Sequence, residues 1–286
     1  MKGDAVVECV PNVSEGRDAR ILDVLSSSLS DVRLLDRSHD PDHHRAVFTF
    51  AGHPEAVLAA AVSLAEAAIK NIRMAAHEGV HPRIGALDVL PFVPISGVSL
   101  QECAALAHRA AQILWQRFGL PSFFYEAAGT RPLEQVRRLA RAGAKPDIGA
   151  GRHPTAGAVA IGARNFLIAW NIWLDSNNLA LAQRIARAVR QSNGGFAGVK
   201  ALGLTLPSRN RVQVSLNTVD FETTPLSRVF RAVETSASEA GVRVLGCELI
   251  GLMPERAVEA SAEHQLPWLA WNDDMILERR YSIREC

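Results

Sequence analysis

The order of apolar segments constrains the fold most strongly, because the same order occurs in both halves of the chain. Strands are expected where apolar residues form short runs, and helices where they recur every three or four positions along one face. In the first half, strands are expected at residues 6–11, 32–35, 46–51 and 88–95, and helices at 19–29, 54–72 and 99–118. In the second half, strands are expected at 166–174, 199–206, 211–216 and 242–250, and helices at 178–190, 225–240 and from 254 onward.

Each half therefore contains the order β-α-β-β-α-β, which is the ferredoxin-like or split βαβ arrangement. We predict an α/β (α+β) chain of two such subdomains, residues 1–164 and 165–286, with a further basic helix at 130–141. Helices would cover one face of each sheet. The other face must then be buried or must bind a ligand.

Composition and charge limit the class of protein. Hydrophobic residues make up 48% of the chain and charged residues 21%, and the formal net charge is +1, so no overall field attracts nucleic acid or an anionic membrane. No apolar run approaches the roughly 20 residues that span a bilayer, and the N-terminus lacks the apolar region of a secretory signal. The four cysteines are widely spaced, as in cytosolic proteins. We expect a cytoplasmic protein with small-molecule partners.

A polar segment, AAHEGVHPRIGALDV, lies between the expected long helix and a buried strand at residues 75–89. It contains His77 and His81 four positions apart, and Arg83 follows. Histidine titrates closest to neutral pH, which suits it to proton transfer, so His81 is the first candidate for a general acid or base. The alternative is two surface histidines at a helix end.

Other polar residues lie in expected connections between elements. The loop at 36–45, DRSHDPDHHR, invites a metal site, but its spacing shows no convergent ligand set. We favour a solvated loop in which Arg45 and a histidine face a ligand. Arg83 and Arg164 could hold carboxylates, although arginines are more often surface charges. The tryptophans Trp170 and Trp173 are three positions apart in one strand and therefore face opposite ways, one toward the core and one toward a cleft.

The segment at 147–164, DIGAGRHPTAGAVAIGAR, is rich in glycine. It lacks the GxGxxG and GxxxxGK[ST] patterns, which excludes a dinucleotide site or a P-loop on pattern. Its glycines could let the backbone approach a flat or anionic ligand, or could form a flexible hinge between the two subdomains.

Taken together, five segments resemble the formiminotransferase domain family, the glutamate formimidoyltransferases. They are VECVPNVSEGRD (7–18), DPDHHRAVFTFAG (40–52), HEGVHPRIGALDVLPFVPISGVS (77–99), GAVAIGARNFLIAWNI (157–172) and VQVSLNTVDFETTPL (212–226). The resemblance implies transfer of the formimino group from N-formimino-L-glutamate to tetrahydrofolate, giving glutamate and 5-formiminotetrahydrofolate, a step of histidine degradation. It also implies two α/β subdomains whose sheets face a cleft or tunnel, and no cyclodeaminase domain, since the chain ends at Cys286.

The resemblance assigns roles to particular residues. The catalytic histidine of the family falls on His81, and tetrahydrofolate is the co-substrate, with no metal expected. We expect a homodimer. The folate-binding segment falls on Gly149, Ala150, Gly151, Arg152, His153, Pro154, Thr155, Ala156 and Gly157. The expected substrate-binding residues are Asn12, Asp36, His44, Arg45, Arg83 and Arg164.

The chain departs from the family pattern at Ser38, at His44 and in the shortened segment 126–157. These positions are possible substrate contacts. Two alternatives therefore stay open: a related folate-dependent transferase that uses another formyl or formimidoyl donor, and a non-catalytic folate-binding protein.

Overall fold

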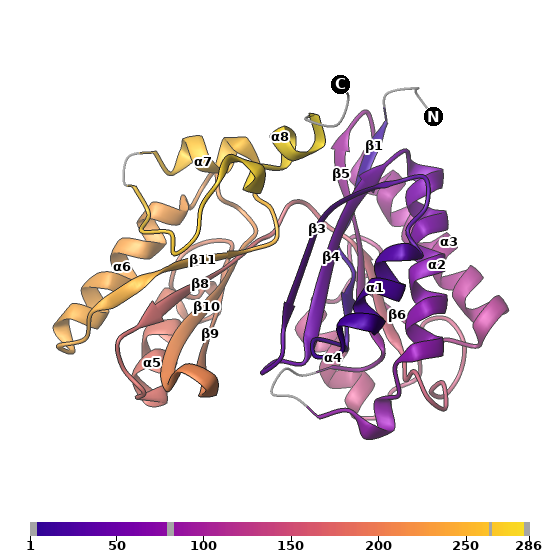
Figure 1. Ribbon diagram of the computed structural model, residues 1–286, viewed down its shortest axis with the longest axis horizontal. Coiled ribbons are helices and arrows are strands. Elements are labelled where there is room, and N and C mark those ends of the chain that lie inside the picture. Colours follow the sequence, from indigo (N-terminus) through magenta and orange to yellow (C-terminus); the bar gives the residue numbers. More distant parts are fainter. Residues whose placement is uncertain (1–4, 79–82, 263–264, 283–286) are drawn as a thin grey trace. The chain divides into compact units, whose positions relative to one another are not determined.

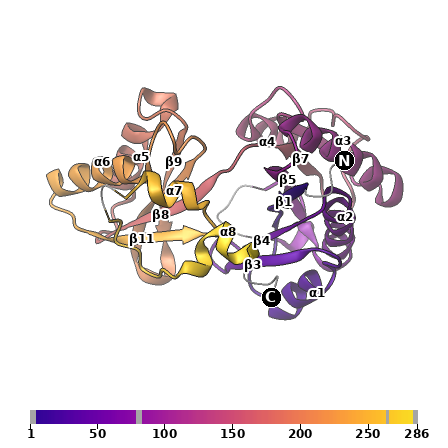
Figure 2. The same cartoon turned by 90° about the horizontal axis from the view of Figure 1, so that it is seen from above.

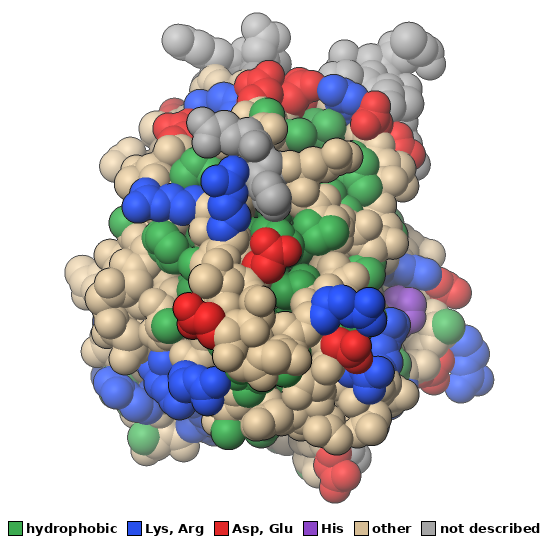
Figure 3. Space-filling model, turned by 90° about the vertical axis from the view of Figure 1, so that its left-hand side faces the viewer, with side chains coloured by type: hydrophobic (Ala, Val, Ile, Leu, Met, Phe, Trp, Pro, Cys, Tyr) green, Lys and Arg blue, Asp and Glu red, His purple; other side chains and the backbone are tan. Residues whose placement is uncertain are grey.

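The computed structural model describes residues 5–78, 83–262 and 265–282, and the chain divides into two units, Met1–Asn165 and Phe166–Cys286 (Figure 1). The predicted catalytic His81 lies outside the described residues. Within the described ranges, no helix is long and apolar enough to cross a membrane. Charged side chains of both signs are interspersed on the face shown in Figure 3, in keeping with the small net charge.

The first unit is built on a seven-stranded sheet in which β1 and β2 follow each other between the same two neighbours, β4 and β5. From one edge to the other the order is β3, β4, β1 with β2, β5, β7 and β6. Among the described residues, the neighbours that pair in parallel are β5 with β7 and β7 with β6, and the other pairings of this sheet are antiparallel. The first part of this order is that of a ferredoxin-like sheet, and the parallel strands extend it. The strands are β1 (Val6–Cys9), β2 (Asn12–Val13), β3 (Arg33–Asp40), β4 (Arg45–Gly52), β5 (Leu87–Ser96), β6 (Ser122–Glu126) and β7 (Val159–Ala163).

Helices cover both faces of this sheet, but unequally. One core cluster joins α1 (Ala19–Ser27), α2 (Pro54–Asn71) and α3 (Leu100–Phe118) to one face, where α2 and α3 lie side by side (Figure 2). The predicted Ser99–Glu102 capping box starts α3. A smaller cluster packs α4 (Leu133–Arg141) on the second face, over β6 and β7. The 3₁₀ turn η1 (Met74–Ala76) precedes the histidine segment.

The second unit has the predicted β-α-β-β-α-β order, with an antiparallel sheet in the order β11-β8-β10-β9. Its helices α5 (Leu179–Val189) and α6 (Leu226–Glu239) pack on one face (Figure 1). The strands are β8 (Ile168–Leu174), β9 (Val199–Leu206), β10 (Arg211–Thr218) and β11 (Val244–Ile250), and the remaining elements are η2 (Gln191–Asn193), η3 (Pro207–Arg209), α7 (Glu255–Ala260), η4 (Asp273–Met275) and α8 (Leu277–Ser282).

The prediction for the tryptophan pair is confirmed. Trp170 is fully buried in the helix-side core, where its Nε1 donates to Thr218 Oγ1 at 3.1 Å. Trp173 belongs to the opposite face of the sheet, because side chains alternate along a strand.

One prediction of local structure was wrong, and two strands were missed. The segment 36–45 is not a loop throughout, since β3 continues to Asp40 and only residues 41–44 form the turn into β4. Among the described residues, β3 pairs with β4 alone and is therefore an edge strand. Edge strands can carry polar residues, and these residues led to the prediction of a loop. Strands β6 and β7 were not predicted. In β7 every residue is small or buried on both sides, so it has neither alternation nor length to distinguish it from a connection.

Candidate functional site

The exit from β2 lies against the segment that follows Arg83. Ser14 donates its backbone N–H to Ala86 O at 2.8 Å and its hydroxyl to Gly85 O at 2.7 Å. Ser14 is 2% exposed, so these bonds are shielded from water and tie the two segments together.

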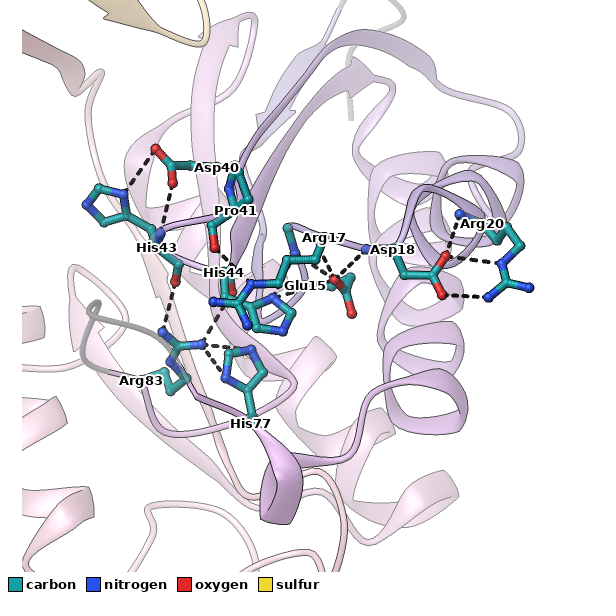
Figure 4. A network of polar contacts seen from close by, with 11 residues as sticks. Glu15, Arg17, Asp18, Arg20, Asp40, Pro41, His43, His44, His77 and Arg83 are labelled. Carbon is teal, nitrogen blue, oxygen red and sulfur yellow. Dashed lines mark hydrogen bonds and ion pairs between the residues drawn. The ribbon is translucent and has the colours of Figure 1, made fainter. Parts of the chain in front are cut away.

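The next residue, Glu15, is a buried carboxylate that the backbone holds in place. Its Oε1 accepts the N–H groups of Gly16, Arg17 and Asp18, at 2.9, 2.7 and 3.0 Å (Figure 4). Asp18 then caps α1 by accepting the N–H of Arg20. These three bonds fix the position of the Glu15 carboxyl group just before α1.

His44 occupies the turn between β3 and β4 with a positive φ of 48°, a conformation that few residues other than glycine adopt. Its Nδ1 accepts the N–H of Gly16 at 3.1 Å and lies 3.5 Å from Glu15 Oε1. An accepting Nδ1 carries no proton, so the ring is the neutral form with its proton on Nε2. Burial lowers the pKa of His44, Arg17 and Arg83 lower it further, and Glu15 opposes them.

His77 stacks on His44, with ring centroids 4.1 Å apart and planes inclined by 29°. Arg83 Nη1 lies 2.7 Å from His77 Nε2 and also contacts Nδ1 (Figure 4). Burial, followed by the positive charge of Arg83, lowers the pKa of His77 to about 4. Both stacked imidazoles are therefore neutral at pH 7.

Arg83 itself is anchored by the turn that carries His44. Its Nη2 donates to His43 O at 2.9 Å and its Nη1 to His44 O at 3.3 Å. His43 is held in turn by Asp40, whose carboxylate lies 3.1 Å from His43 Nδ1 and has its pKa lowered to about 2 by that bond. The β3–β4 turn thus fixes the guanidinium of Arg83 beside the histidine pair.

A buried ion pair supports the backbone just after Arg83. Asp88 is 2% exposed; its Oδ1 accepts the N–H of Ile84 at 2.7 Å, and its Oδ2 pairs with Arg137 of α4. Neither Asp88 nor Arg137 was among the predicted site residues. The available signal was a carboxylate at the start of an apolar strand, since a buried charge requires a partner.

Arg45 lies close to the same charges. Burial lowers the pKa of Arg45 to about 10, as do the positive charges of Arg137 and, to a smaller extent, Arg83, while Asp88 opposes them. Three guanidinium groups are therefore within electrostatic range of one buried carboxylate. Guanidinium groups can hold a carboxylate through paired N–H donors.

The predicted folate segment packs directly against the same backbone. Ala86 donates its N–H to Ala156 O at 2.9 Å, and Ala158 donates to Ile84 O at 3.1 Å. A β-bridge joins Gly85 to Gly157 between these bonds. The segment 149–157 and the Arg83 segment are thus brought together, although they are far apart in the sequence.

Glycines at this junction serve contacts within the protein. A Cβ on Gly85 would lie 2.0 Å from Ala158 O, and one on Gly157, where φ is 76°, would lie 2.4 Å from Ile84 O. Gly149 faces the ring of Trp115 in the same way. Only Gly151 among the glycines of 149–157 has open space at the Cβ position, so contact with a ligand is left to the exposed stretch around it.

Two other predicted substrate-binding residues, Asp36 and Asn12, lie on the same face of the sheet as Arg45. In the strand register, Asp36 lies across from Thr49, and Asn12 lies across from Val47. Asp36 and Asn12 therefore share the face of the sheet that carries Arg45, and α1 packs on the other face. The amide of Asn12 donates to Val10 O at 2.9 Å.

Arg164 is not brought to this cluster within the first unit. It follows the last residue of β7, whereas Gly157 precedes the first, so the length of the strand, about 17 Å, separates them. No group of three or more His, Cys, Asp or Glu side chains among the described residues is arranged to hold a metal ion.

Comparison with known families decides the relationship. The model of the formiminotransferase domain, N-terminal subdomain, matches residues 6–164, and that of the formiminotransferase domain matches residues 169–285. The chain belongs to the formiminotransferase family.

Two relatives within the formiminotransferase family are similar along nearly their whole length, and a third is longer. A glutamate formimidoyltransferase of Streptococcus pyogenes serotype M1 is 41% identical over 91% of this chain and 93% of that protein. One of Thermoplasma acidophilum is 37% identical over 96% and 97%. A formimidoyltransferase-cyclodeaminase of Mus musculus is 38% identical over 88% of this chain, which spans only 51% of that longer protein.

Proposed function

We propose that this chain is a glutamate formimidoyltransferase, which moves the formimino group of N-formimino-L-glutamate to tetrahydrofolate. The observation that carries the proposal is the junction of residues 84–86 with residues 156–158, at which the Arg83 segment meets the segment proposed to bind folate. Two substrates must be held together for such a transfer, and positioning them supplies much of the rate acceleration.

The reaction requires a proton to move between two nitrogens. N5 of tetrahydrofolate forms a bond to the formimino carbon and loses its proton, and the bond from that carbon to the glutamate nitrogen breaks as this nitrogen gains a proton. A histidine that titrates near neutral pH can serve as base and then as acid. We assign this role to His81. The stacked pair His44 and His77 is a poor proton acceptor, since its pKa values are lowered, but the neutral ring of His44 can donate a hydrogen bond from Nε2.

The guanidinium groups of Arg45 and Arg83 suit the carboxylates of this reaction. Both substrates carry a glutamate moiety, and guanidinium groups bind carboxylates through paired N–H donors. Within residues 149–157, the exposed stretch Ala150, Gly151, Arg152 and Pro154 is the part available to tetrahydrofolate. Asn12, Asp36 and Arg164 remain proposed substrate contacts, and a homodimer remains the proposed assembly, which sedimentation would test.

The test is turnover of N-formimino-L-glutamate with tetrahydrofolate by the wild-type chain and by His81→Ala. Removal of a general acid–base group is expected to lower kcat by about 10²–10⁴-fold while 5-formyltetrahydrofolate still binds in calorimetry. His53→Ala is the control, because His53 is exposed and its side chain forms no capping bond at the start of α2.

Three results would contradict this proposal. Retained turnover in His81→Ala would remove His81 from the proton transfer. Wild-type turnover of N-formyl-L-glutamate in place of the formimino compound would indicate another donor. Binding of the folate without any turnover would indicate a binding protein.

A further inference from the structure

The second unit contains a cavity that the proposed function has not yet used. It has a volume of about 320 Å³ and lies beside β11, on the side of the sheet where Trp173 emerges. Its lining combines one tryptophan, one arginine and one glutamate with apolar walls, contributed by Trp173, Arg209, Glu248, Leu249, Leu269 and Met275.

Glu248 is the only acidic residue in that lining, and the protein positions it with neutral groups. Its Oε2 accepts Asn171 Nδ2 at 3.0 Å and Trp173 Nε1 at 3.3 Å. Across the described ranges, no Lys, Arg or His forms an ion pair with Glu248. A half-buried carboxylate without a counter-ion is costly, so the site favours a cationic ligand.

Arg209 is held by stacking. Its guanidinium lies over the ring of Trp173, 4.1 Å from the centroid, and it makes neither a hydrogen bond nor an ion pair with any residue that the structure describes. Its N–H donors therefore stay available on a surface that fixes their position. The cavity holds a carboxylate and a guanidinium that do not neutralise each other.

We propose that this cavity binds a small amino-acid derivative with a planar amidinium group and a carboxylate, which in the proposed reaction is N-formimino-L-glutamate. This inference rests on the proposed function, from which the identity of the ligand is taken. The formimino group is an amidine and is protonated at neutral pH, so its two N–H groups match Glu248 as a guanidinium fork would. Arg209 binds a carboxylate of the same molecule, and the methylene groups contact Leu249 and Leu269.

Size and charge favour this ligand over the pterin ring of folate. The volume is at the lower end of the roughly 300–1,000 Å³ of small-molecule sites, which suits an amino-acid derivative and not a whole folate. A pterin edge also presents two N–H donors, but it is neutral and would leave the charge of Glu248 uncompensated. The site therefore discriminates by the positive charge of the amidinium.

The experiment compares N-formimino-L-glutamate with N-formyl-L-glutamate, which has the same shape but no positive charge. Calorimetry without folate is expected to show tighter binding of the formimino compound to the wild-type chain. Glu248→Gln keeps the size and one acceptor oxygen but removes the charge, and it should lose at least tenfold in affinity for the formimino compound with little change for the formyl compound. Arg209→Met should weaken both, since both carry carboxylates.

Glu222→Gln is the matched control, because Glu222 is an exposed carboxylate of the same unit that pairs with Arg256. The inference would be overturned if Glu248→Gln lost affinity for both compounds equally or for neither. It would also be overturned if this variant raised only the KM of tetrahydrofolate. Absence of wild-type turnover would instead contradict the proposed function, and the binding preference would still decide this inference. Melting curves exclude misfolding of the variants.

Discussion

Replacement of Asp88 by asparagine gives the sharpest test of how the candidate site is supported. The carboxylate is 2% exposed and joins Ile84 N–H to Arg137, whose side chain is 13% exposed. Asparagine has the same shape and can still accept from Ile84. It cannot neutralise Arg137, so Asp88→Asn isolates the loss of the buried charge pair.

The expected loss in the free energy of unfolding depends on the charge of Arg137, which stays buried after the substitution. Breaking a buried ion pair by removing one partner costs about 3–5 kcal/mol, because the other charge stays buried. Nε of Arg137 is already buried without a hydrogen-bond partner in the described part of the chain. Because asparagine can still accept the N–H of Ile84, we expect Asp88→Asn to lower the free energy of unfolding by about 3 kcal/mol, the lower end of that range. The double variant Asp88→Asn with Arg137→Leu also removes the unpaired charge of Arg137. It should regain at least about 1 kcal/mol of the lost stability.

Hydrogen exchange read by mass spectrometry on peptides of β5 measures this change in the first unit alone. Lys70→Ala is the control, because Lys70 and Glu66 form an exposed pair one helical turn apart, worth about 0.5 kcal/mol or less. A cost below about 1 kcal/mol for Asp88→Asn, or no recovery in the double variant, would refute the argument that this pair is buried and coupled.

Two further outcomes are expected. The folded chain holds His77 with a pKa of about 4 against 6.5 when unfolded, so it binds fewer protons between these values; stability should therefore be full above about pH 6.5 and fall toward pH 4. Urea unfolding at a series of pH values measures this, and His77→Gln should reduce the dependence; an unchanged profile would contradict it. Gly85→Ala should cost roughly 3 kcal/mol or more, since its Cβ would meet Ala158 O, whereas Gly151→Ala, with open space, should cost only about 1 kcal/mol for its positive φ. Equal melting temperatures for the two glycine variants would contradict the contact.

The fold could be predicted largely because its strands and helices have distinct periods. The second unit follows the predicted order throughout, and Pro54 and Ser99 mark helix starts in the first. The parallel extension was missed because β6 and β7 are only five residues long and almost uniformly buried, so neither shows alternation. Patterns of local sequence carry no information about which strand enters the middle of a sheet.

The candidate site was predictable in its residue types and less so in its connections. His44, Arg45 and Arg83 were selected from polar turns, and the structure groups them. The partnership of Asp88 with Arg137 depends on α4 reaching across the sheet, which no local pattern encodes. The glycines of 149–157 were interpreted as space for a ligand or as a hinge, whereas Gly85 and Gly157 permit a close approach of two backbones.

The placement of β7 also has a consequence for the time at which the site forms. Although β7 is the last strand of its unit in the sequence, it lies between β5 and β6, and the residues before it complete the junction with Gly85. The two halves of the junction are separated by β5, α3, β6 and α4, so closing it is a contact of long sequence separation, which is slow to form. A nascent or partly unfolded chain can hold the antiparallel part of the sheet without this strand. Binding competence should therefore appear only at the final step of folding, and a ligand that spans the junction would select the completed sheet.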